Sequence, residues 1–187
     1  PAMPPSESPR LHNVMYIYED DARTHLGKPL IGFGRARSLN DSDAILKRNF
    51  SEVVTRAQGI WWSMGESHID PVAEPAFRPL LKQFQDIGTF ALELDRAPAA
   101  EIAVLVDDES YYYESINNDL DVPLIFQQRL WGLPRLGAPA DYYLLNDFLD
   151  GKLPPYKLYI ILNPWHLDDS RRAALDRELH HDNRVAL

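Results

Sequence analysis

Hydrophobic residues are distributed along this chain in short runs that alternate with amphipathic stretches. Residues 14–18 (VMYIY) form a β-branched and aromatic run that ends abruptly in three acidic residues. Such a run is typical of a strand buried on both faces, with polar groups at its carboxyl end. Residues 60–64 (IWWSM) predict a second buried strand. Between them, apolar residues recur at helical spacing from residue 46 to residue 57, which predicts an amphipathic helix capped by Asn40 or Asp41.

The same alternation continues beyond a second predicted helix at residues 76–94. Residues 95–100 (DRAPAA) are typical of a linker, and the pattern then restarts. We expect strands at residues 101–106, 142–145, 156–162 and 184–187. One helix should begin at Asp121, and another, capped by Asp168 or Asp169, should end near residue 180. Strands that alternate with helices predict an α/β fold with parallel sheets. With a strand close to each terminus, we expect the chain to be part of a longer one.

Composition narrows the class of protein. The chain has 187 residues, of which 45% are hydrophobic and 25% charged, as in soluble globular proteins. A net charge of −9 argues against a nucleic-acid partner, which needs clustered Lys and Arg. No apolar run approaches the ~20 residues that cross a bilayer, so we expect no membrane partner. Cysteine is absent, which excludes thiolate chemistry and fits either a reducing compartment or a hot environment. We expect a cytoplasmic location. Residues 1–13 are expected to be a disordered lead.

Three stretches together resemble one family of enzymes. They are YIYEDDARTHLG (residues 16–27), ILKRNFSEVVTRAQGIWWSMG (residues 45–65), and EIAVLVDDESYYYES followed by DYYLLNDFLDGKLPPYKLYIILNPWHLDD (residues 101–115 and 141–169). In this order they resemble glycoside hydrolases related to family 42 β-galactosidases. The resemblance implies the end of a β/α (TIM-type) barrel at residues 14–95. It implies a trimerisation domain with a flavodoxin-like or glutamine-amidotransferase-like fold, apparently truncated, at residues 96–187. In flavodoxin-like topology, strand 101–106 should lie between strands 142–145 and 156–162.

The resemblance also implies a glycosidase that cleaves a carbohydrate substrate. By position, Glu19 corresponds to the family's nucleophile, and catalytic groups of such barrels do lie at the carboxyl ends of strands. Trp61 or Trp62 corresponds to the sugar-stacking aromatic residue. The acid/base Glu of the fourth barrel strand is not in this chain, although the chemistry needs two carboxylates. Glu66, which follows the second strand, is the candidate companion.

Each candidate has a plainer interpretation. Glu19 can be a solvated acid at a turn, Glu66 a loop acid, and both tryptophans core residues. His25 and His68 follow the two strands and are candidates for lining a sugar site, or they are ordinary loop histidines.

In the second half, an acidic loop at residues 107–109 without glycine would repel a flavin phosphate. We therefore expect no cofactor. We also expect no metal, because His180 and His181 end a predicted helix, where cationic side chains favour the helix dipole. Residues 111–113 (YYY) are expected to serve packing or an interface. We expect a homo-oligomer, because a partial barrel leaves strand edges unpaired. Two functions remain open: a glycoside hydrolase or a fragment of one, and a non-catalytic module for oligomerisation or carbohydrate binding.

Overall fold

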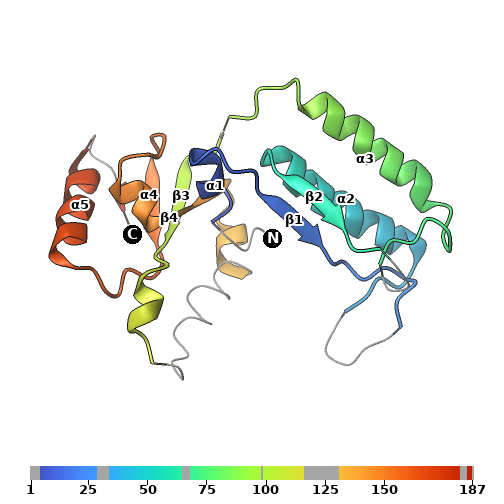
Figure 1. Ribbon diagram of the computed structural model, residues 1–187, viewed down its shortest axis with the longest axis horizontal. Coiled ribbons are helices and arrows are strands. Elements are labelled where there is room, and N and C mark those ends of the chain that lie inside the picture. The colour runs from blue at the N-terminus through green and yellow to red at the C-terminus, as the bar shows by residue number, and fades with distance from the viewer. Residues whose placement is uncertain are drawn as a thin grey trace. The chain divides into compact units, whose positions relative to one another are not determined.

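The chain folds as two compact α/β units, of which one comprises residues 15–97 and the other residues 1–14 and 98–187 (Figure 1). The structure is a computed structural model, and it describes residues 5–28, 34–64, 68–97, 99–115, 131–181 and 185–186. Both units contain parallel sheets, so the α/β fold class is confirmed. The helix expected from Asp121 falls on residues 121–130, which lie outside the described residues.

The unit of residues 15–97 is built on a pair of parallel strands. Strand β1 (Ile17–Asp20) pairs with β2 (Gly59–Trp62), and helix α2 (Leu39–Thr55) connects them (Figure 1). Helix α3 (Phe77–Ala91) follows. The predicted parallel pairing of these strands is therefore confirmed. Helix α2 begins two or three residues earlier than expected, because the side chain of Ser38 caps it by accepting a hydrogen bond from the backbone N–H of Asp41.

The core of this unit lies between the two helices and one face of the strand pair. Aromatic rings form its centre: Phe50 and Phe84 stack with centroids 4.4 Å apart, and Trp62 stacks on Phe84 at 5.6 Å. The other buried members of this cluster are Leu46, Ile69, Phe77 and Leu80. Because side chains alternate along a strand, only one face of the pair enters this core.

The other face of the pair is exposed, which corrects the expectation of a strand buried on both sides. The strand begins at Ile17 rather than at residue 14, and the side chains of Ile17, Met15 and Val14 are 50%, 72% and 58% exposed. The physical reason is that α2 and α3 pack on one side only. The described part of this unit contains a two-stranded sheet and no closed barrel.

The second unit holds a four-stranded parallel sheet. The strand order is β4 (Ala140–Leu144), β3 (Ile102–Val106), β5 (Leu158–Ile161), β6 (Val185–Ala186). The expected internal place of the first strand is thus confirmed, and the order is compatible with a flavodoxin-like half domain. All five residues of β3 are buried, as expected for an internal strand covered on both faces.

Helices α4 (Leu145–Leu149) and α5 (Asp169–His180) pack on one face of that sheet. The side chain of Asp168 caps α5 by accepting a hydrogen bond from the backbone N–H of Arg171, as the sequence predicted. On the opposite face, Leu133 of a short 3-10 turn, Leu133–Arg135, packs against Val104 and its neighbours.

The beginning of the chain is ordered where it is described, which corrects the expected disordered lead. Helix α1 (Ser8–Leu11) lies at the free edge of β4. The Glu7 carboxylate accepts a hydrogen bond from the backbone N–H of Tyr142 (2.8 Å), and the Ser8 hydroxyl accepts one from that of Leu144 (2.8 Å). Both side chains are buried. They satisfy edge N–H groups that would otherwise lack partners, and this gain orders the segment.

Candidate functional site

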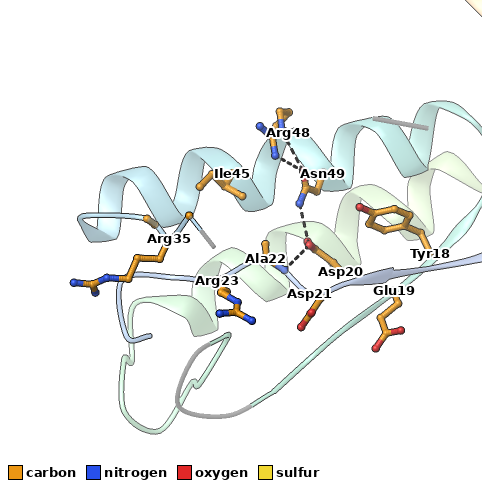
Figure 2. Close-up of a pocket in the computed structure, with 12 residues that line it drawn as sticks. Tyr18, Glu19, Asp20, Asp21, Ala22, Arg23, Arg35, Ile45, Arg48 and Asn49 are labelled. Carbon is orange, nitrogen blue, oxygen red and sulfur yellow. Dashed lines mark hydrogen bonds between the residues drawn. The ribbon is translucent and has the colours of Figure 1, made fainter. Parts of the chain in front are cut away.

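A carboxylate and an indole ring lie side by side on the exposed face of the strand pair. The parallel register pairs Glu19 of β1 with Trp61 of β2, so the two side chains project from the same face. Both are exposed, Trp61 at 53%. Figure 2 shows the Glu19 side chain pointing away from helix α2. In the described part of the chain, no hydrogen bond or ion pair engages its carboxylate. The Glu19 carboxylate is therefore accessible to a ligand from solvent.

Its neighbour Asp20 has the opposite environment. Asp20 is 3% exposed, and its Oδ1 accepts hydrogen bonds from the backbone N–H of Ala22 (3.1 Å) and from Nδ2 of Asn49 (2.9 Å). The Asn49 side-chain oxygen in turn accepts two hydrogen bonds from Arg48 (Figure 2). Burial raises the pKa of Asp20. This carboxyl group holds the end of β1 against α2, so that the next residue back, Glu19, faces outward.

A pocket of about 500 Å³ opens at this end of the strand. Its walls come from the end of β1, from the segments around residues 22 and 35, and from the middle of α2 (Figure 2). The charged side chains that line it are Glu19, Asp20, Asp21, Arg23, Arg35 and Arg48. Opposite charges are therefore interspersed around the opening.

Both candidate histidines hold loops rather than line this pocket in the described structure. The Nδ1 of His25 lies 2.9 Å from the Ser42 hydroxyl, and its Nε2 lies 3.5 Å from Glu74. The Nε2 of His68 lies 2.5 Å from the Asp21 carboxylate. These contacts connect the loops after β1 and β2 to each other and to α2. Of the three acids that end β1, Asp20 and Asp21 are thus engaged by local partners, and Glu19 is left.

The two remaining candidates from the sequence are Trp62 and Glu66. Trp62 points into the helix-covered core and stacks on Phe84 and Phe50, so its ring is placed as a core residue. Glu66 lies outside the described residues, and its role as the companion carboxylate stays a prediction. Asn49 was missed by the sequence reasoning. The signal was available, because a polar residue three positions after Leu46 falls on the apolar face of the helix.

In the acidic loop of the second unit, the first acid, Asp107, is bound by side chains of the protein itself. Asp107 is fully buried at the carboxyl end of β3, where Nη2 of Arg171 donates to it (2.6 Å) and the Ser110 hydroxyl donates to it (2.5 Å). Asn163 fixes the backbone of Asp107 through both of its amide atoms. A closed ion pair thus fills the position where flavodoxin-like folds bind ligands. Arg171 was also missed by the sequence reasoning, because its contact with Asp107 joins residues 64 positions apart.

The tyrosines after this loop lie at the surface. Tyr112 and Tyr113 are 87% and 64% exposed, and the ring of Tyr113 stacks on His166. Their expected part in an interface stays a prediction.

In the described residues, no group of three or more His, Asp or Glu side chains is placed to hold a metal ion. No described helix is both long and apolar enough to cross a membrane.

No known protein family, curated protein or solved structure matches this chain.

Proposed function

We propose that this chain binds carbohydrate and takes part in hydrolysis of glycosidic bonds, with Glu19 as the nucleophile and Trp61 as the platform for a sugar ring. One observation carries the proposal: Glu19 and Trp61 are paired in register on an exposed sheet face. A flat aromatic ring stacks on the C–H face of a sugar, and a carboxylate beside it reaches the anomeric carbon. The unit of residues 15–97 would then be the end of a β/α barrel, as the family resemblance implies.

The electrostatics of the strand end support a nucleophile at Glu19 rather than at its neighbours. A nucleophile must be ionised and accessible. Asp20 is buried, and burial raises its pKa, which favours its neutral form. Asp21 is paired with His68. Glu19 has neither restraint among the described residues, and the Asp20–Asn49 hydrogen bond fixes the backbone from which it projects.

A complete mechanism needs a second carboxyl group, about 5–5.5 Å from the first in a retaining enzyme. The proposal assigns this part to Glu66 because it follows β2, the strand that carries Trp61. If Glu66 does not serve, a second chain has to supply the acid. A site with Trp61 but no second acid would still bind sugar, which keeps the non-catalytic carbohydrate-binding module as the second candidate.

A panel of chromogenic aryl glycosides tests the proposal. We expect one or more of them to be hydrolysed, and Glu19→Gln to lower kcat by roughly 10³-fold or more while the fold survives. The matched control is Glu93→Gln, an exposed glutamate after α3, which should retain full activity.

Trp61→Ala separates the two candidates. In a hydrolase it should raise KM or lower kcat/KM by about tenfold. Saturable sugar binding that needs Trp61, without turnover of any glycoside, would support the binding module instead. Neither turnover nor binding would refute both.

A further inference from the structure

A surface with a distinct chemistry lies in the unit of the four-stranded sheet, at the carboxyl ends of β3 and β5. These strands are parallel neighbours, so the segments that follow them, residues 107–114 and 162–168, leave the sheet side by side. From β3 the chain passes to β4 on one side and later to β5 on the other. In open α/β sheets, ligands bind outside the carboxyl ends of the strands at the point where the strand order reverses in this way.

Contacts between the two segments hold this surface in place. The buried Ser110 hydroxyl accepts a hydrogen bond from the backbone N–H of His166 (3.1 Å), and the ring of Tyr113 stacks on that of His166. The Asn163 amide also donates to the backbone carbonyl of Asp107 (2.6 Å). The side chains that project from these segments are therefore carried by an ordered base, which lowers the entropic cost of binding a partner.

Aromatic side chains project from both segments. Tyr112 is 87% exposed and Tyr113 64%, and Trp165 on the second segment is 37% exposed. Tyrosine and tryptophan are the residues that most often carry the binding energy of protein–protein contacts, because each buries a large rigid ring. Exposed rings on two adjoining segments thus favour a protein partner over a small molecule.

The charge around these rings is negative. Residues 107–109 are three acids ahead of the tyrosines, and residues 168–169 are two more at the start of α5. The nearest cations along the chain, Arg171 and Arg172, each pair with one or more of these acids. Asp108 is exposed, and in the described part of the chain no hydrogen bond or ion pair engages its carboxylate. The surface is therefore complementary to a cationic partner.

We propose that this surface binds an arginine-bearing segment of a partner protein. Guanidinium groups stack on the exposed tyrosine rings and donate hydrogen bonds to the carboxylates beside them. Arginine suits the surface better than lysine, because its planar group stacks on rings and is more weakly hydrated than an ammonium. The binding is independent of the function proposed for Glu19 and Trp61, which belong to the other unit.

The test is fluorescence anisotropy of a labelled hexapeptide of alternating arginine and glycine, titrated with the full chain. We expect saturable binding, at least about tenfold tighter than binding of the same peptide with citrulline, the neutral counterpart of arginine. The corresponding lysine peptide has the same charge and should bind at least about threefold more weakly than the arginine peptide.

Two substitutions locate the binding on this surface. Tyr112→Ser should weaken binding of the arginine peptide about threefold to fivefold, and Asp108→Asn about threefold. Both side chains are exposed, so neither substitution should change the Tm. The matched controls are Phe90→Ser and Glu93→Gln, which remove an exposed ring and an exposed charge from the other unit and should leave the affinity unchanged.

Three results would overturn the proposal. They are no saturable binding of the arginine peptide, unchanged affinity in Tyr112→Ser, and equal affinities for the arginine and lysine peptides, as a general attraction to an acidic protein would give. If a second copy of this chain is the occupant instead, wild type should self-associate, Tyr112→Ser should abolish that association, and the peptide should not bind.

Discussion

Asp20 shows how one buried carboxyl group makes folding depend on pH. Burial raises its pKa in the folded chain above the ordinary value of 3.8. The folded state therefore holds this proton at pH values where the unfolded state has released it. Folding is favoured at low pH, and this contribution is lost as pH rises from about 3.8 through the folded pKa.

We expect Asp20→Asn to remove that part of the pH dependence. Urea unfolding of wild type between about pH 4 and pH 7 should show a free energy of unfolding that falls with pH more steeply than in the variant. Asp108→Asn, at an exposed position, should leave the slope as in wild type. An unchanged slope in Asp20→Asn would mean that the buried environment of this carboxyl does not exist in solution.

The Asp107–Arg171 ion pair is the corresponding feature of the other unit. The Asp107 side chain is fully buried and that of Arg171 is 12% exposed, so removal of the cation leaves a charge in the interior. Arg171→Gln should lower the free energy of unfolding by roughly 3–5 kcal/mol.

The double variant Asp107→Asn with Arg171→Gln should recover part of that loss, because it also removes the buried charge. Denaturant titrations of the four proteins in the cycle measure the coupling energy. Purely additive effects of the two substitutions would contradict the account of this pair.

At the scale of elements, the first described segment acts as a cover for the edge of β4. Ser8→Ala removes the acceptor for the Leu144 backbone N–H and should cost about 1 kcal/mol. Faster amide hydrogen exchange at Leu144, with no change at Val104 of the central strand, would locate the effect at the edge. Ser51→Ala, on the exposed side of α2, is the control. Equal exchange at Leu144 in both variants would contradict the edge contact.

Sequence patterns were sufficient for the elements whose environment is local or regular. Residues 102–106 are apolar throughout, which predicted a buried strand, and the flavodoxin-like topology that the resemblance implies predicted its internal place in the sheet. Ser8 and Glu7 were not predicted, because their role depends on an edge about 135 positions later in the chain. The exposed side of β1 was also missed. An apolar run such as VMYIY indicates a strand but does not say whether both of its faces are covered.

The candidate site also has one feature that the sequence could predict and one that it could not. Two parallel strands joined by one helix bring their carboxyl ends to the same edge of the sheet, so the proximity of Glu19 and Trp61 was open to sequence reasoning, although their exact register was not. The inward turn of Asp20 toward Asn49 was not, since it depends on how α2 docks on the strand pair.

At the scale of the whole molecule, the exposed apolar surface bears on assembly. Met15, Ile17 and Trp61 are each at least half exposed on or beside the strand pair, and Tyr112 is exposed in the other unit. Apolar surface of this kind favours association, and the expectation of a homo-oligomer stands as a prediction. Light scattering at micromolar concentration should give a mass above that of one chain.

Met15→Lys places a charge beside the exposed strand face and should shift the population toward the monomer. A single monomeric species in wild type would contradict the prediction.

As the nucleophile of a glycoside-cleaving site, Glu19 would form a covalent bond to the sugar during turnover. A 2-deoxy-2-fluoro glycoside with a good leaving group tests it most directly, because the fluorine slows breakdown of a covalent glycosyl-enzyme. Peptide mass spectrometry of the treated chain then reads the attachment site. We expect one added sugar, on the peptide that carries Glu19, and none in Glu19→Gln. Attachment to a different carboxylate, or hydrolysis of the glycoside by a chain in which Glu19 is never labelled, would contradict it.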